Sequence, residues 1–291
     1  MSCGKSQPSI FPSWYVQFAA LAAGGHISNR LPCWHAMLFS YFDDSSDERR
    51  KKYFAAGGLI GGEDQWFTFD LRWLDATREL KKPFRSTECE CNHGQFKHWS
   101  KTKCNALMDK LVTVIRFYRL SGFASIVPID EYRRVFPKSE EFDPYYLGVA
   151  HTIVNMGVIG YNIHHDVKLW FEDNPSTKPS TNRIYDGLKA VKGWNPATRL
   201  RGIDFDGKEL CPLQAADLVA REAFKHIDNL GIRPTRIPVK RMGDSLSFIV
   251  WNKATLEYLR DNGGPNNLEL LTHWGKQGKK VPNMAVFWRN F

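Results

Sequence analysis

The sequence predicts one α/β domain, because segments with the pattern of β-strands alternate with segments with the pattern of α-helices. Hydrophobic residues make up 43% of the 291 positions and aromatic residues 13%, which supports a sizeable core and excludes a disordered chain. No internal repeat or long low-complexity linker divides the sequence. We expect the domain at 35–228, after a poorly ordered leader at 1–34 and before a C-terminal extension at 229–291 that packs on the same domain.

The strand predictions rest on short apolar runs bounded by polar turns or glycine. The first run, 35–42, ends at a polar turn that begins with Asp43, and the second, 53–60, carries the pair Gly57 and Gly58. A short polar loop joins the two runs, so we expect a hairpin. Further strands are expected at 123–129, 167–171 and 248–251.

The helix predictions rest on apolar residues that recur at steps of three and four. The segment 63–81 places Trp66, Phe69 and Trp73 on one side and ends before Pro83. The same periodicity runs from 101 to 120. Other helices are expected at 144–157, 183–191, 212–228 and 253–261. The segment 84–98, rich in Cys and His, is expected to be irregular.

The chain is basic, with a formal net charge of +9. An excess of this size favours an anionic partner, and nucleic acid is the commonest one. The alternative is a charged surface that faces only solvent. Clusters of Lys and Arg flank the late helix at 189–201 and 233–241, and Trp194 in the first cluster is a candidate to stack on a base.

The six cysteines are irregularly spaced, so we expect reduced thiols and a cytoplasmic protein rather than a disulfide framework. No run of 18 apolar residues is present, so no membrane span is expected. The stretch 16–23 has weak features of a signal-peptide core, but a loosely ordered leader is the better interpretation.

The late helix carries the strongest functional signal. Gln214 and Asp217 are three residues apart, so they share one helix face, although their neighbours are mostly apolar. Burying a carboxylate costs free energy unless a polar group meets it. Either Gln214 and Asp217 satisfy each other, or Asp217 meets a second polar cluster.

Further carboxylates follow two of the predicted strands. Asp43 and Asp44 follow the first strand, and Glu172 and Asp173 follow the strand at 167–171. Each one alone is typical of a turn. If they converge with Asp217, their repulsion calls for a divalent cation, and Mg²⁺ or Mn²⁺ prefers such oxygen ligands. Ions of this kind beside a phosphodiester activate water and stabilise the leaving oxygen.

Two short motifs in these segments resemble the bacterial and phage family called domain of unknown function 3800 (DUF3800). The family has a Tyr-x-Asp-Glu-Ser-Gly-Asp stretch after its first strand and a late Gln-x-x-Asp. The corresponding residues here are Tyr41-Phe42-Asp43-Asp44-Ser45-Ser46-Asp47 and Gln214-Ala215-Ala216-Asp217. The resemblance runs from about 36 to 228. Asp44 replaces the usual Glu and is one methylene shorter, and Ser46 replaces the usual Gly.

The resemblance implies a ribonuclease H-like fold, which is a mixed sheet flanked by helices with carboxylates gathered around divalent metal. It implies that Asp43, Glu172 and Asp217 hold Mg²⁺ or Mn²⁺, with Asp44 and Asp173 in support and Gln214 orienting Asp217 or touching substrate. The expected function is a metal-dependent nuclease or phosphodiesterase that acts on nucleic acid. The alternative is a catalytically inactive nucleic-acid-binding or partner-binding protein of the same fold.

Other polar residues are weaker candidates. The spacing of Cys89, Cys91 and His93, followed by His98 and Cys104, fits no familiar zinc pattern. By resemblance, His93 is expected to approach the active site or the substrate.

Two polar segments stand close to predicted strands. The segment 164–166, His-His-Asp, is a candidate to bind metal or to act as a base, but the favoured interpretation is that it caps the entry to the strand at 167–171. The segment 204–207 is expected to form a turn, which would place Asp206 at the rim of the site.

Overall fold

The structure, a computed structural model, describes residues 37–47, 52–138, 143–273 and 285–287. The predicted leader at 1–34, including the apolar stretch 16–23, lies outside the described residues. No helix among the described residues is long and apolar enough to cross a membrane.

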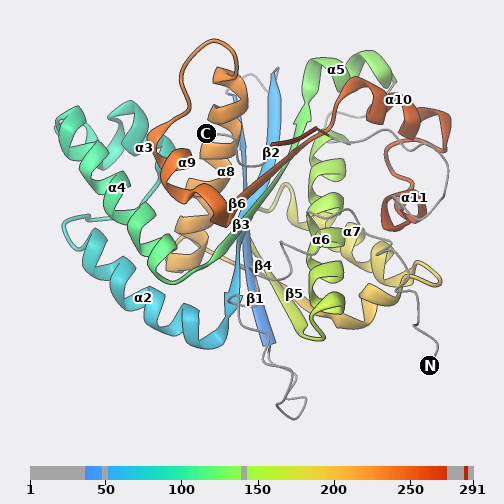
Figure 1. The fold of residues 1–291 in the computed structure, drawn as a ribbon, viewed down its shortest axis with the longest axis horizontal. Helices are drawn as coiled ribbons and strands as arrows, with labels where there is room; N and C mark the ends of the chain where they lie inside the picture. Colours follow the sequence, from blue (N-terminus) through green and yellow to red (C-terminus); the bar gives the residue numbers. More distant parts are fainter. Residues whose placement is uncertain (1–36, 48–51, 139–142, 274–284, 288–291) are drawn as a thin grey trace, which may run out of the picture.

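A mixed seven-stranded sheet forms the centre of the molecule, in the order β5-β4-β1-β2-β3-β6-β7 (Figure 1). The strands β1, β4 and β5 are parallel to one another, and β2 is antiparallel to both of its neighbours. The predicted hairpin is therefore confirmed as the pair β1–β2. The strands are β1 (Met37–Ser46), β2 (Tyr53–Gly62), β3 (Ser121–Pro128), β4 (Asp166–Glu172), β5 (Leu200–Asp206), β6 (Leu246–Val250) and β7 (Ala285–Phe287).

Helices cover both faces of the sheet, so the α/β class is confirmed. In Figure 1, α2, α4, α8 and α9 lie on one side and α6, α7, α10 and α11 on the other. The helices are α2 (Glu63–Thr77), α3 (Ser86–Cys91), α4 (Lys101–Phe117), α5 (Ile129–Val135), α6 (Asp143–Asn162), α7 (Lys178–Ala190), α8 (Cys211–Asn229), α9 (Ile237–Met242), α10 (Lys253–Asp261) and α11 (Leu268–Thr272).

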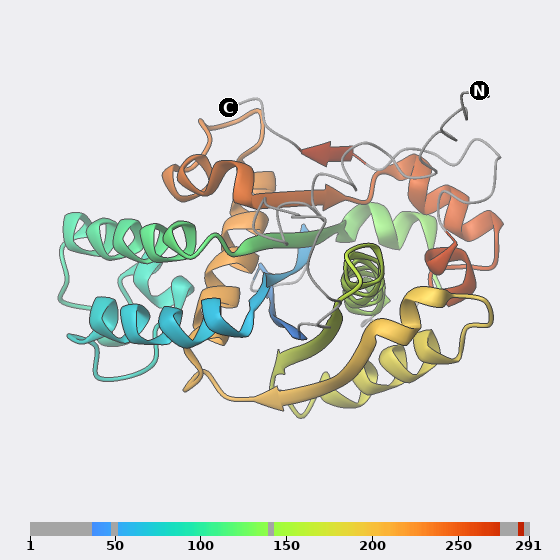
Figure 2. The ribbon, with the colours of Figure 1, turned by 60° about the horizontal axis from the view of Figure 1, so that its bottom comes forward.

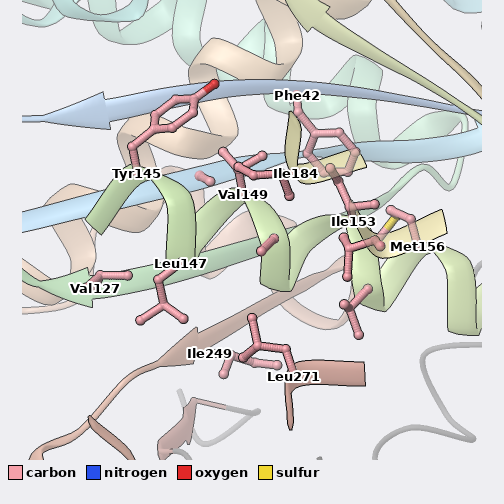
Figure 3. Close-up of a cluster of buried hydrophobic side chains, with 14 of the residues drawn as sticks. Phe42, Val127, Tyr145, Leu147, Val149, Ile153, Met156, Ile184, Ile249 and Leu271 are labelled. Carbon is pink, nitrogen blue, oxygen red and sulfur yellow. The ribbon is translucent and has the colours of Figure 1, made fainter. Parts of the chain in front are cut away.

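The core on the α6 side is continuous from the sheet to the outer helices. Figure 3 shows Val149, Ile153 and Met156 of α6 beside Phe42 of β1, all of them buried. A polar group is enclosed here: the imidazole Nδ1 of His151 lies 2.9 Å from the hydroxyl of Ser125. Burial lowers the pKa of His151 to about 3, so the ring is neutral at physiological pH.

The core on the α8 side depends on close approach to β2. A Cβ on Gly57 would lie 3.0 Å from the Cα of Ala220 in α8. A Cβ on Gly58 would collide with the carbonyl of Tyr41 and would lie 2.6 Å from the ring of Phe42. The glycine pair seen in the sequence therefore allows β1, β2 and α8 to pack tightly.

Ion pairs connect the segment after α8 to that helix. The guanidinium of Arg236 lies 2.7 Å from Glu222 and 2.8 Å from Glu90 of α3, and Glu90 also pairs with Arg221 at 2.7 Å. Glu222 has no exposed side-chain surface. Its carboxylate therefore relies on Arg236 for its countercharge.

The structure differs from the sequence prediction in two places. The segment 84–98, predicted to be irregular, contains α3 and a 3-10 turn at Gly94–Phe96. The predicted turn at 204–207 is wrong, because Asp204 and Asp206 belong to β5. In that strand the acidic side chains alternate with Ile203 and Phe205, which pack against the core on the α6 side. The C-terminal segment adds β6 to the sheet, parallel to β3 (Figure 2).

Candidate functional site

The carboxyl ends of three parallel strands bring three acidic residues into one row. Phe42 of β1 is paired with Phe171 of β4, so the next residues, Asp43 and Glu172, share the opposite face of the sheet. Glu172 is in turn paired with Asp206 at the end of β5. The predicted convergence of Asp43 with Glu172 is therefore seen at this edge of the sheet.

A buried lysine lies among these carboxylates. Lys208, in the loop between β5 and α8, is 3% exposed. Its ammonium contacts Oδ2 of Asp43 and lies 3.6 Å from Oε2 of Glu172. It also donates to the carbonyl of Leu213 at 3.3 Å. The sequence patterns do not indicate Lys208, which directly follows the segment 204–207 that was expected to form a turn.

Asp217 approaches the same group from α8. It is buried, and its Oδ2 accepts a hydrogen bond of 2.6 Å from the backbone N–H of Ser86. Its negative charge raises the pKa of Lys208, and the charge of Asp43 raises the pKa of Asp217, so the three groups act on one another electrostatically. The carboxylate on the apolar helix thus has partners in two distant segments of the chain.

Gln214 has a positioning role. Its Oε1 accepts from Trp73 Nε1 at 2.9 Å and from the N–H of Phe84 at 3.0 Å, while its Nε2 donates to the carbonyl of Lys208 at 2.8 Å. The alternative in which Gln214 and Asp217 satisfy each other is therefore wrong. The amide instead connects α8 with α2, with the segment before α3 and with the loop that carries Lys208.

The electrostatics of this cluster are dominated by burial. Desolvation raises the pKa of Asp43 and of Asp217, and the attraction of Lys208 opposes this shift only in part. Burial alone would lower the pKa of Lys208, but Asp43, Asp217 and Glu172 together raise it above its usual value. Lys208 is therefore an ammonium at neutral pH and supplies the countercharge inside the cluster.

The remaining predicted acidic residues lie at the edge of this cluster. Asp173 forms an ion pair of 2.9 Å with Lys178, and Asp206 accepts from the N–H of Gly207 at 2.7 Å. On the outer side, Glu172 also pairs with Arg85 at 3.0 Å.

A small cavity adjoins the cluster on the side of α6 and α7. Its empty volume is about 320 Å³, including space open to solvent. Asp43, Asp44 and Glu172 line one part of it, and Tyr145 and Thr177 line another. Asp44 thus contributes to the cavity wall, while Asp43 and Glu172 border both the cavity and the lysine.

The carboxylates around Lys208 do not constitute a preformed metal site. Within the described ranges, no group of three or more His, Cys, Asp or Glu side chains is arranged to hold a metal ion. This statement also covers the segment of Cys89, Cys91 and His93. Cys89 is buried, with its thiol 3.8 Å from the carbonyl of Cys104, whereas Cys91 and His93 are exposed.

The surroundings of two further candidate residues, Asp166 and Trp194, indicate a structural role. Asp166, at the start of β4, pairs with Arg201 at 2.7 Å and with Arg199 at 3.5 Å, so it holds the beginning of that strand. Trp194 is 3% exposed and packs against Gly157 of α6. The expectation that Trp194 stacks on a base is therefore wrong.

Comparison of the chain with protein-family models, with curated proteins and with solved structures finds no match.

Proposed function

We propose that this protein is a metal-dependent nuclease or phosphodiesterase with a ribonuclease H-like fold, and that Asp43, Glu172, Asp217 and Lys208 form its active centre. The observation that carries the proposal is the convergence of three carboxylates, from β1, β4 and α8, on one buried ammonium. The mixed sheet flanked by helices and the DUF3800-like motifs support the same proposal.

The chemistry of the donor set fits a divalent cation. Three carboxylates and one ammonium leave a formal charge of −2, which one divalent ion neutralises. All three acidic groups are oxygen donors, as Mg²⁺ and Mn²⁺ require. Asp43, Glu172 and Asp217 would hold the ion, which would compete with the Lys208 ammonium for them. When bound, the ion would supply an activated water and stabilisation of the leaving oxygen.

The surrounding residues hold these groups in place. Ser86 fixes one oxygen of Asp217, and Gln214 fixes the backbone of Lys208. In the proposed reaction, Lys208 and the half-exposed Arg85 contribute positive charge to the phosphate oxygens.

A cleavage assay tests the proposal. Labelled single-stranded DNA, duplex DNA, RNA and RNA–DNA hybrid are incubated with the full chain and either Mg²⁺, Mn²⁺ or EDTA. We expect cleavage that requires a cation and falls at least about 100-fold in Asp43→Asn and Asp217→Asn. The control Asp75→Asn, on the surface of α2, should keep full activity. Absence of cation-dependent cleavage of all four substrates would exclude the proposed activity.

A second candidate is a catalytically inactive nucleic-acid-binding protein of the same fold. The ion pair between Lys208 and Asp43 favours this candidate, because carboxylates that already have an ammonium as countercharge can be stable without metal. This candidate predicts nucleic-acid binding that is unchanged by EDTA and is not followed by cleavage. In either case we propose a cytoplasmic protein, since Cys89, Cys91, Cys104 and Cys211 are free thiols.

A further inference from the structure

The sheet face that carries the acidic row continues into a row of aromatic rings. Strand register pairs Tyr41 of β1 with Trp170 of β4, and Trp170 with Asp204 of β5. Side chains of paired residues share a face, so this row is the neighbour of the row formed by Asp43 and Glu172. Two residues along a parallel strand span about 6.6 Å, which is the separation of the two rows.

This part of the face is less covered than the other face of the same strands. Tyr41, Lys168 and Trp170 are half-buried, whereas Leu169 and Phe171, which point to α6, are buried. The next row of this face, further from Asp43 and Glu172, contains Lys168 paired with Gly202. A Cβ on Gly202 would meet no atom within 4 Å.

The rings form a supported surface. Tyr41 and Trp170 are nearly parallel, with centroids 6.0 Å apart and planes 20° apart. Trp66 packs edge-on against Tyr41 at 4.8 Å and donates from its Nε1 to the carbonyl of Phe39 at 3.0 Å. Because α2 and the sheet backbone hold these rings, stacking on them would cost little conformational entropy.

A cation lies beside the rings. The ammonium of Lys168 lies 5.1 Å from the centroid of Trp170 and pairs with Asp204 at 2.6 Å. A base that stacks on Trp170 would replace the cation–π contact and leave Lys168 free to contact a phosphate.

We propose that Tyr41 and Trp170 form a stacking platform for a base of single-stranded nucleic acid. The inference rests on the proposed function, since it places the backbone of that nucleotide beside Asp43 and Glu172. Single strands are favoured over duplexes, because only unpaired and unstacked bases present their faces to an aromatic ring. The platform reads no base edge, so it accepts any sequence.

Binding in EDTA tests the platform separately from catalysis. The anisotropy of fluorescein-labelled single-stranded DNA, single-stranded RNA and duplex DNA is measured with the full chain. We expect Trp170→Ala to weaken single-strand binding about 5- to 150-fold, as the loss of one stacked base does. Trp170→Phe should retain most of the affinity, and the control Trp99→Ala, which removes a ring beside α4, should change it less than about two-fold.

A second variant keeps the test valid if Trp170→Ala does not fold. Gly202→Glu fits the open space at that position and adds a negative charge beside Lys168, so it should weaken binding without unfolding the protein. Equal binding of duplex and single strand, or unchanged affinity in folded Trp170→Ala or Gly202→Glu, overturns the platform. Cleavage that persists in those variants with unchanged binding leaves the proposed function intact. Trp170-dependent binding without any cleavage leaves the platform intact and removes the nuclease.

Discussion

Replacing Lys208 with methionine is the most informative perturbation of this protein. Methionine has a similar length but no charge, so the variant leaves Asp43, Glu172 and Asp217 without their buried countercharge. Breaking a buried ion pair on one side costs about 3–5 kcal/mol. The lost hydrogen bond to Leu213 belongs to the same change. We therefore expect Lys208→Met to lower the free energy of unfolding by about 3–5 kcal/mol at pH 7.

The loss should depend on pH in a defined direction. The folded-state pKa of Lys208 is raised, so its stabilisation is fully present below the unfolded value of 10.5 and is lost as pH rises through the folded pKa. The pKa values of Asp43 and Asp217 are also raised, so both carboxyls gain protons as pH falls. A protonated carboxyl needs no countercharge. The difference between wild type and Lys208→Met should therefore shrink as pH falls from 7 toward 4.

Urea unfolding with and without Mn²⁺ measures the effect. If Asp43, Glu172 and Asp217 can bind a cation, Mn²⁺ at 100 times its dissociation constant returns about 2.7 kcal/mol to the variant. Lys189→Met is the matched control, because its ammonium donates to the carbonyls of Ala197 and Leu200 and Mn²⁺ cannot replace it there. A loss below about 1 kcal/mol in Lys208→Met would refute the buried countercharge. Absence of any Mn²⁺ effect on Lys208→Met would refute a cation site at the carboxylates.

Three other perturbations have expected outcomes. The pKa of His151 is lowered from 6.5 to about 3, so the contribution of the neutral ring to stability is complete above pH 6.5 and falls by up to about 5 kcal/mol as pH drops toward 3. The free energy of unfolding should therefore depend less on pH over this range in His151→Leu than in the wild type, as urea unfolding at each pH would measure. Arg236→Met strands a fully buried carboxylate and should cost about 3–5 kcal/mol in urea unfolding, whereas Arg233→Met, at an exposed position, should cost under about 0.5 kcal/mol. Gly58→Ala collides with β1 and should cost about 1–3 kcal/mol or more, while Gly202→Ala, in open space, should be neutral within about 1 kcal/mol; similar melting temperatures for the two would contradict the packing described for β2.

Most of the fold could be predicted because its elements have clear hydrophobic periodicity. The helix over α4 and the strands of the β1–β2 hairpin are examples, and α10 has the bounds predicted, 253–261. The strand β5 was missed because it contains Gly202 and two aspartates, so local turn propensity outweighed its alternating pattern. Sheet order was not accessible, because it depends on pairing between distant segments.

The acidic residues of the candidate site could be predicted from the sequence, but its buried lysine could not. Asp217 was identified because a carboxylate on an apolar helix requires a partner, and the structure supplies one. Lys208 directly follows the predicted turn at 204–207, so no apolar pattern marks it as buried. A signal was present, because Lys208 lies just before the largely buried helix α8. The partners of Gln214 could not be predicted, because residues such as Trp73 lie far away in sequence.

The central position of β1 in the sheet constrains the order of events during synthesis. Asp43 leaves the ribosome within the first segments, but Lys208 emerges 165 positions later. Until then, the carboxyl end of β1 has no countercharge and must remain hydrated. Pairing of β4 with β1 and docking of α8 are likewise long-range contacts, which form slowly. A nascent chain that ends before α8 therefore cannot complete the centre, so any hydrolytic activity would be confined to chains whose synthesis has passed residue 217.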